Sequence, residues 1–164
     1  MKIDLGISTC PNDTFMFHGI IHRKIDLEDL DFQIRYLDVQ ELNELCEADQ
    51  LDCSKVSFHA AVRFADRYGV LRSAAALGNG VGPIVVSRQD GLVPSPVTTV
   101  CCPGAWTTAT MLFRLAYPEA ERIEHRVFSD IMPAVQRGDV DMGVVIHEGR
   151  FTYREQGLYL TSDL

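Results

Sequence analysis

Residues 140–153 read VDMGVVIHEGRFTY, and this stretch decides the fold. Val144, Val145 and Ile146 form a β-branched run, which is typical of a central parallel strand covered on both faces. The run ends on His147, and ligands of open α/β sheets bind beyond the carboxyl ends of strands. A neutral imidazole accepts a proton near pH 7, so His147 is a candidate general base. The alternative is a structural histidine bonded to a loop carbonyl.

Strand-like and helix-like segments alternate along the rest of the chain. Strands are expected at 3–7, 32–37, 97–102 and 123–128, a strand or extended run at 70–77, and helices at 13–23, 58–68 and about 105–117. This alternation predicts an α/β fold with largely parallel sheets. The segment 78–96 is rich in glycine and proline, which predicts a break between two lobes, residues 1–88 and 89–164.

The charge of the chain limits its partners. The 164 residues carry a formal net charge of -8, which argues against a general nucleic-acid surface or an anionic membrane surface. We therefore predict no nucleic-acid and no membrane partner, and an anionic small molecule only in a locally positive pocket. The N-terminus lacks the apolar core of a signal peptide, and no stretch is apolar for long enough to span a bilayer.

The cysteines and histidines do not form a metal pattern. The five cysteines lack paired metal spacing, which favours reduced thiols in a cytoplasmic protein. Cys101 and Cys102 are either a vicinal redox pair or small buried strand residues. His18 and His22 lie four apart on a predicted helix, but no carboxylate or cysteine partner is evident nearby, so a surface or packing role is expected.

Three turns combine hydroxyl side chains with a helix start. They are residues 8–14, where Asn12 or Asp13 is expected to cap a helix, residues 54–57, and residues 104–108. Free backbone N–H groups and the positive end of the helix dipole attract anions at such positions. If the three turns meet beside one ligand, they form a receptor for a carboxylate. The alternative is that all three are ordinary helix caps.

Three motifs carry a family resemblance. They are STCPNDTF at 8–15, GVGP at 80–83 and IHEGRFTY at 146–153. Together they resemble the 1,4-dihydroxy-6-naphthoate synthase family, the cyclic dehypoxanthine futalosine cleaving enzymes of the futalosine route to menaquinone. The resemblance covers the whole chain. The first and third motifs separate it from chorismate dehydratase, the sister family in the same pathway.

The resemblance implies a fold and a reaction. The fold is the two-lobed periplasmic-binding-protein-like (type II) fold, with the active site between the lobes. The reaction breaks a carbon–carbon bond of cyclic dehypoxanthine futalosine, releases dihydroxyacetone and leaves 1,4-dihydroxy-6-naphthoate. His147 is implied to be the proton-abstracting base, and Lys55, Val56, Ser57, Thr107 and Thr108 match substrate-binding positions. No metal and no organic cofactor is implied.

Length is the one departure from the resembled family, whose members are longer. We therefore expect a chain truncated at its C-terminus, without the segment that returns to complete the first lobe. Activity of the 164-residue chain then depends on whether that segment is needed. Such a lobe exposes apolar surface and favours self-association, with a homodimer as the simplest assembly.

Two other functions stay open at this point. One is chorismate dehydratase of the same pathway. The other is a non-catalytic cytoplasmic binding protein for a small carboxylate, because the fold alone does not determine function. A binding protein does not require a base at His147.

Overall fold

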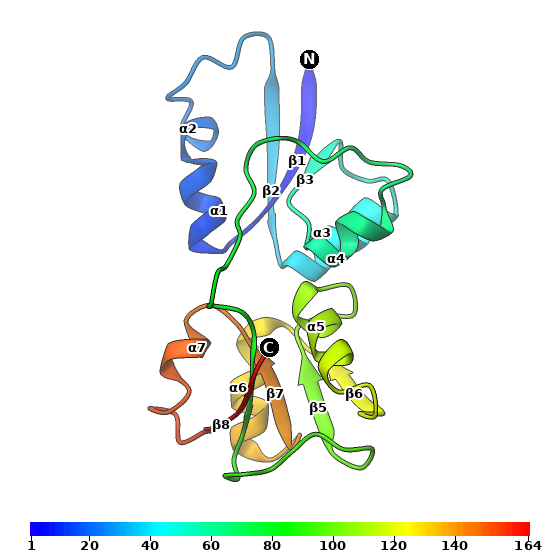
Figure 1. Ribbon diagram of the computed structural model, residues 1–164. Coiled ribbons are helices and arrows are strands. Elements are labelled where there is room, and N and C mark those ends of the chain that lie inside the picture. Colours follow the sequence, from blue (N-terminus) through cyan, green and yellow to red (C-terminus); the bar gives the residue numbers. More distant parts are fainter. The chain divides into compact units, whose positions relative to one another are not determined.

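The computed structural model describes all residues from 1 to 164 and divides them into two compact units. Unit 1 is Met1–Leu77 and unit 2 is Gly78–Leu164 (Figure 1). The division falls earlier than the boundary expected at 88/89. The reason is that the strand at Ile84–Ser87 pairs entirely with strands of unit 2.

Unit 1 is a small parallel sheet with four short helices. Its elements are β1 (Lys2–Ser8), α1 (Pro11–Met16), α2 (His18–Ile21), β2 (Asp31–Leu37), α3 (Val39–Glu47), β3 (Cys53–Ser54) and α4 (Phe58–Arg63). The strand order is β2-β1-β3, and both pairings are parallel. In Figure 1, α1 and α2 lie to one side of these strands and α3 and α4 to the other.

The core of unit 1 forms where α3 packs on β1. Leu5 and Ile7 of β1 and Leu42 of α3 are almost fully buried. Gly6 allows this close packing, because a Cβ there would come within 2.6 Å of Leu42 and 2.8 Å of Leu51. Asp38 starts α3 with a capping box, in which its side chain accepts from the backbone N–H of Gln40 and the side chain of Glu41 accepts from the backbone N–H of Asp38. The beginning of α3 is thereby fixed beside the sheet.

Three expected elements of unit 1 differ in the structure. The single helix expected at 13–23 is two helices that meet at Phe17, which serves as the C-cap of α1 and the N-cap of α2. The helix expected at 58–68 ends at Arg63, and residues 70–77 form neither strand nor helix. Residues 69–77 are almost all exposed, so they lack the buried face that would hold a strand in a sheet.

Unit 2 is built on a five-stranded mixed sheet. Its elements are β4 (Ile84–Ser87), β5 (Thr99–Cys102), α5 (Thr108–Ala116), β6 (Arg122–His125), α6 (Phe128–Arg137), β7 (Met142–Val145), α7 (Gly149–Thr152) and β8 (Tyr159–Asp163). The strand order is β6-β5-β7-β4-β8. β5 is parallel to β6 and to β7, whereas β4 runs antiparallel to β7 and to β8. β7 is central, as its apolar run predicted, but only one of its neighbours is parallel.

The two faces of this sheet have separate apolar cores. Cys101 and Val145 lie in a cluster with α6 residues, and Cys102 and Val144 lie in a cluster with α5 residues. Adjacent strand residues point to opposite faces, so the two vicinal cysteines are buried in different cores. Helices therefore cover both faces of β5 and β7, as a continuous apolar run requires. No helix of the chain is long and apolar enough to cross a membrane.

Candidate active-site residues

His147 lies just beyond the end of β7, where the sequence predicted it. Its backbone φ of 51° is in the left-handed region, which costs an L-residue roughly 1–2 kcal/mol. The side chain is exposed, and its ring makes an edge contact with the ring of Phe128 at a centroid distance of 5.9 Å. Strained residues of this kind persist where the surrounding structure holds them, often at functional sites. The turn presents an imidazole at the carboxyl end of a central strand.

Glu148 follows His147 directly and is a second candidate base, and it occupies the same turn and not the strand. Its backbone is helical, and it is the N-cap residue of α7, accepting at its carbonyl from the backbone N–H groups of Phe151 and Thr152. The alternation of side chains along a strand therefore does not separate His147 from Glu148. Both residues are exposed, so geometry alone leaves two ionisable side chains beside each other at this turn.

Arg150 stabilises the turn that contains His147. Its backbone N–H donates to the carbonyl of His147 at 3.2 Å. Its guanidinium donates from Nη1 to the carbonyl of Gly82 at 2.9 Å and to Asp163 at 2.7 Å, and from Nη2 to the carbonyl of Gly80 at 3.2 Å and to Asp163. This hydrogen-bonded pair lowers the pKa of Asp163. Arg150 thus connects the His147 turn through its backbone, and the segment before β4 and β8 through its side chain.

Ser57 is the N-cap of α4, and a buried asparagine orients it. Its Oγ accepts from the backbone N–H of Ala60 at 3.3 Å. Asn43 of α3 donates from Nδ2 to the same Oγ at 3.2 Å, and its Oδ1 accepts from the Ser57 backbone N–H at 3.1 Å. Asn43 is fully buried. The sequence gives little sign of the role of Asn43. It shows only that Asn43 is a polar residue next to the apolar residues of α3.

Lys55 and Asp13 form a partly buried ion pair. Lys55 Nζ lies 3.4 Å from Asp13 Oδ1 and donates to the carbonyl of Ala74 at 2.9 Å. Asp13 Oδ2 accepts from both the hydroxyl and the backbone N–H of Ser8, at 2.7 and 3.2 Å. Asp13 therefore does not cap α1 as expected, because its carboxylate binds back to the end of β1. The positive charge of Lys55 is shared with a carboxylate.

Two predicted site residues of unit 1, Asn12 and Val56, contribute less to the candidate site. Asn12 is exposed in the first turn of α1, and the N-cap of that helix is Cys10, which provides no side-chain hydrogen bond to the helix start. Val56 is partly exposed between Lys55 and Ser57. The structure therefore brings Asp13, Lys55 and Ser57 to the carboxyl ends of β1 and β3, with Val56 as the connecting residue.

Thr107 is a buried helix cap in unit 2. Its Oγ1 accepts from the Thr110 backbone N–H at 3.3 Å and lies within hydrogen-bond distance of Thr110 Oγ1 and of the Gly104 carbonyl. Thr110 Oγ1 donates to the same carbonyl at 2.6 Å. Thr107 is 3% exposed, whereas Thr108 is partly exposed at the first position of α5. The hydroxyl of Thr107 is thus already used in fixing the turn.

The three expected anion-binding turns are unequal. α1 and α4 have six residues each and α5 has nine, so the first two sum few peptide dipoles. Two of the turns, at Ser57 and Thr107, are genuine side-chain caps. The helix dipole therefore contributes less at α1 and α4 than the sequence suggested, and the side-chain hydroxyls carry the chemistry.

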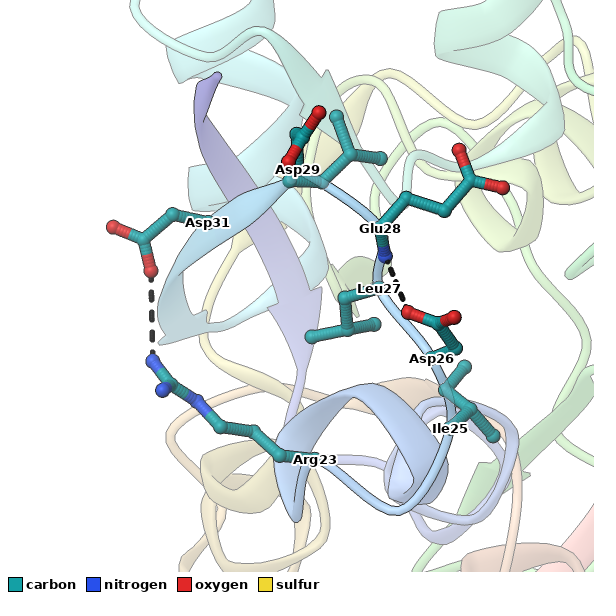
Figure 2. A pocket seen from close by; sticks show the side chains of 8 residues that line it. Arg23, Ile25, Asp26, Leu27, Glu28, Asp29 and Asp31 are labelled. Carbon is teal, nitrogen blue, oxygen red and sulfur yellow. Dashed lines mark hydrogen bonds and ion pairs between the residues drawn. The ribbon is translucent and has the colours of Figure 1, made fainter.

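Neither of two surface hollows involves the predicted residues. The first, of about 440 Å³, is lined by Arg23 and residues 25–31 in the loop before β2 (Figure 2). Arg23 pairs there with Asp31, and Asp26 accepts from the backbone N–H of Glu28. Four carboxylates against one arginine disfavour an anionic ligand. The second, of about 550 Å³, is lined by Asp90, Tyr153, Arg154 and residues 157–160.

The vicinal cysteines and the two neighbouring histidines do not form a redox or metal site. Burial raises the pKa of Cys101 to about 11 and that of Cys102 to about 12, so both thiols stay protonated. The vicinal redox alternative therefore loses its physical basis. His18 and His22 have ring centroids 4.4 Å apart, but no group of three or more metal-binding side chains occurs in the chain.

Comparison with known proteins identifies the sequence relatives. Residues 3–164 match a family model described as "Menaquinone biosynthesis". A protein of Thermus thermophilus named 1,4-dihydroxy-6-naphtoate synthase is 39% identical over 160 residues, which are 98% of this chain and 58% of that protein. The chain thus spans somewhat more than half the length of this relative.

Solved structures agree with this relationship. A protein from Archaeoglobus fulgidus superposes with a TM-score of 0.88 at 32% identity, over 99% of this chain and 60% of that chain. The alkanesulfonate-binding protein SsuA from Xanthomonas axonopodis gives a TM-score of 0.68 at 11% identity, over 98% and 60%. An identity this low shows the fold alone, which is the type II periplasmic-binding-protein-like fold.

Proposed function

The chain belongs to the menaquinone biosynthesis family, and we propose from this membership that it acts as a 1,4-dihydroxy-6-naphthoate synthase. The observation that carries the proposal is the 39% identity to a synthase of that name across almost the whole chain. The same relative favours the synthase over chorismate dehydratase and over a non-catalytic binding protein. The chemistry of the reaction is proposed on this basis.

The proposed reaction is redox-neutral. A base removes a proton from cyclic dehypoxanthine futalosine, the carbon–carbon bond to its three-carbon unit breaks, a proton is returned to that leaving unit, and the remaining ring becomes aromatic. The products are 1,4-dihydroxy-6-naphthoate and dihydroxyacetone. A base that removes the proton and donors that hold the substrate's oxygens are the two requirements, and general acid–base catalysis supplies roughly 10²- to 10⁴-fold of rate.

His147 is the proposed base. Its position beyond a central strand supports this, because ligands of open α/β sheets bind there. Arg150 supports the turn through its bond to the His147 carbonyl.

Each unit, taken by itself, offers residues that we propose as substrate contacts. In unit 1 they are the Ser57 hydroxyl and the Lys55 ammonium, together with Asp13, which pairs with Lys55, and with Val56 and Asn12. In unit 2 they are Thr108 and the turn that Thr107 caps. Asp13 partly neutralises the charge of Lys55. We therefore expect this part of unit 1 to bind hydroxyl and carbonyl oxygens of the substrate as well as a carboxylate. The five free cysteines support a cytoplasmic setting for the reaction.

Product analysis tests the proposal. The purified chain is incubated with cyclic dehypoxanthine futalosine, and 1,4-dihydroxy-6-naphthoate and dihydroxyacetone are quantified by liquid chromatography and mass spectrometry. A second sample carries the C-terminal part of the Thermus thermophilus relative fused after Leu164. Equimolar formation of both products supports the proposal. Unchanged substrate with both proteins, or loss of water from chorismate in a parallel incubation with chorismate, contradicts it.

A further inference from the structure

The exposed segment 69–77 contains one residue that differs from its neighbours, Ala74. Ala74 is the only residue of the segment that is not exposed, and its backbone φ of 59° is in the left-handed region. This region is unfavourable for most L-residues. The segment forms no helix or strand, so regular backbone pairing does not impose this conformation. The conformation therefore depends on a contact of Ala74 itself.

That contact is a hydrogen bond from Lys55. Lys55 Nζ donates to the carbonyl of Ala74 at 2.9 Å, although the two residues are 19 positions apart in the sequence. An ammonium is a strong donor because it is charged. The side chain of Lys55 is 18% exposed, so water competes little for this bond. A partly buried cation thus offsets the cost of the Ala74 conformation.

Asp13 is the second anchor of the same ammonium. Its Oδ1 lies 3.4 Å from Lys55 Nζ, and its Oδ2 accepts from the hydroxyl and the backbone N–H of Ser8 at 2.7 and 3.2 Å. Asp13 is buried, so its carboxylate is itself immobilised at the end of β1. A carboxylate and a carbonyl from distant parts of the sequence of unit 1 therefore fix the position of one long side chain.

We propose that Ala74 is a positioning residue, whose carbonyl, together with the Asp13 carboxylate, holds the Lys55 ammonium in place for an acceptor oxygen of the substrate. A lysine side chain has many rotamers and loses this freedom when it binds a ligand. An ammonium that is already held loses less, so the substrate binds more tightly. The exposed segment 69–77 is then part of the site. The inference rests on the proposed function, because it takes Lys55 to be a substrate contact.

Ala74→Pro tests this role in whichever of the two samples described above forms products. Proline fixes φ at about −65° and cannot adopt the positive angle, so the carbonyl of residue 74 must turn away from Lys55. We expect KM for cyclic dehypoxanthine futalosine to rise about 3- to 10-fold, the factor that corresponds to immobilising one long side chain. Turnover should change less than about twofold, because the proposed base belongs to unit 2. Ala74→Gly allows a positive φ and should keep KM within about twofold.

Two comparisons separate positioning from a general disturbance of the segment. Ala76→Pro introduces proline at an exposed position without positive φ and should leave KM unchanged. In Lys55→Met, the further change Ala74→Pro should alter KM less than about twofold, because the ammonium is already absent. A rise in KM that Ala76→Pro reproduces, or that persists in the Lys55→Met background, overturns the inference. So does an unchanged KM in Ala74→Pro.

Trace labelling with acetic anhydride measures the position of Lys55 without turnover. Lys2 and Lys24, the other lysines of the chain, are exposed and serve as internal references. Mass spectrometry should find Lys55 acetylated more slowly than both in the unsubstituted chain and severalfold faster in Ala74→Pro. Acetylation of Lys55 as fast as that of the references overturns the inference even in an active enzyme, as does a slow rate that Ala74→Pro leaves unchanged. Slow acetylation that Ala74→Pro accelerates, in a chain that leaves the substrate unchanged, contradicts only the proposed reaction.

Discussion

At the scale of single residues, His147 combines an exposed imidazole with a backbone conformation that suits asparagine or glycine better. Asparagine tolerates the left-handed region better than most residues. We therefore expect His147→Asn to keep the free energy of unfolding unchanged or slightly higher, while kcat falls about 10²- to 10⁴-fold through loss of the base. Urea titration and steady-state kinetics measure the two effects.

Glu148→Gln is the matched control, because Glu148 lies in the same exposed turn. Near-normal turnover in His147→Asn together with collapse in Glu148→Gln would move the base one residue along the chain. A loss of stability in His147→Asn that accounts for its lost activity would instead make His147 a structural residue.

Thr107 tests whether a substrate contact and a helix cap have been confused. Thr107→Val removes the hydroxyl that caps α5 and should lower the free energy of unfolding by about 1–2 kcal/mol. Thr107→Ser retains the cap and should recover most of this loss, as chemical denaturation would show. A stable Thr107→Val variant with weakened substrate affinity would mean that the hydroxyl serves the substrate and not the helix.

The sequence was informative about these residues to different degrees. It predicted that His147 follows a strand and that hydroxyls lie at helix starts, because both are local patterns. It did not predict that Asp13 bonds back to Ser8 and Lys55, or that Asn43 supports Ser57. Those contacts join residues that only the tertiary fold brings together.

At the scale of elements, α7 is a single helical turn held by one side chain. Arg150→Met removes the bonds to the carbonyls of Gly80 and Gly82 and to Asp163, so we expect the free energy of unfolding to fall by about 1–3 kcal/mol. Asp163→Asn should cost less, about 0–1 kcal/mol, because Asp163 is exposed. Equal losses in the two variants, measured by urea titration, would show that the carbonyl contacts contribute nothing.

The two buried thiols of β5 should make the free energy of unfolding depend on pH. Burial raises the pKa of Cys101 to about 11 and of Cys102 to about 12, above the ordinary value near 9. The unfolded chain loses these protons first, so stability should fall as pH rises above about 9, by roughly 1.4 kcal/mol per pH unit for each thiol. Urea titrations between pH 8 and 10.5 measure this slope, which Cys102→Ala should reduce. A slope unchanged by Cys102→Ala would place the titrating groups elsewhere.

The element pattern explains what the sequence predicted of the fold and what it missed. The alternation of strands and helices was correct because apolar periodicity is local. The direction of β4 was missed, because an apolar run such as Ile84–Val86 reads the same in parallel and antiparallel pairs. The break inside the helix expected at 13–23 was missed because Phe17 itself is neither proline nor glycine, and the nearest glycine, Gly19, lies inside α2 and not at the break.

At the scale of the whole chain, the division at Leu77/Gly78 predicts where a protease cuts first. Residues 69–77 form no helix or strand and are almost all exposed, which are the properties of a cleavage site. Brief digestion with trypsin should therefore cut after Arg72 before it cuts inside either sheet, giving two fragments that mass spectrometry identifies. Arg72→Gln should slow this first cut strongly and leave later cuts unchanged. The exposed pair Arg23 and Lys24 is the internal competitor, but Arg23 is paired with Asp31. A first cut within β5–β7 would contradict the division, because those strands open only when unit 2 unfolds.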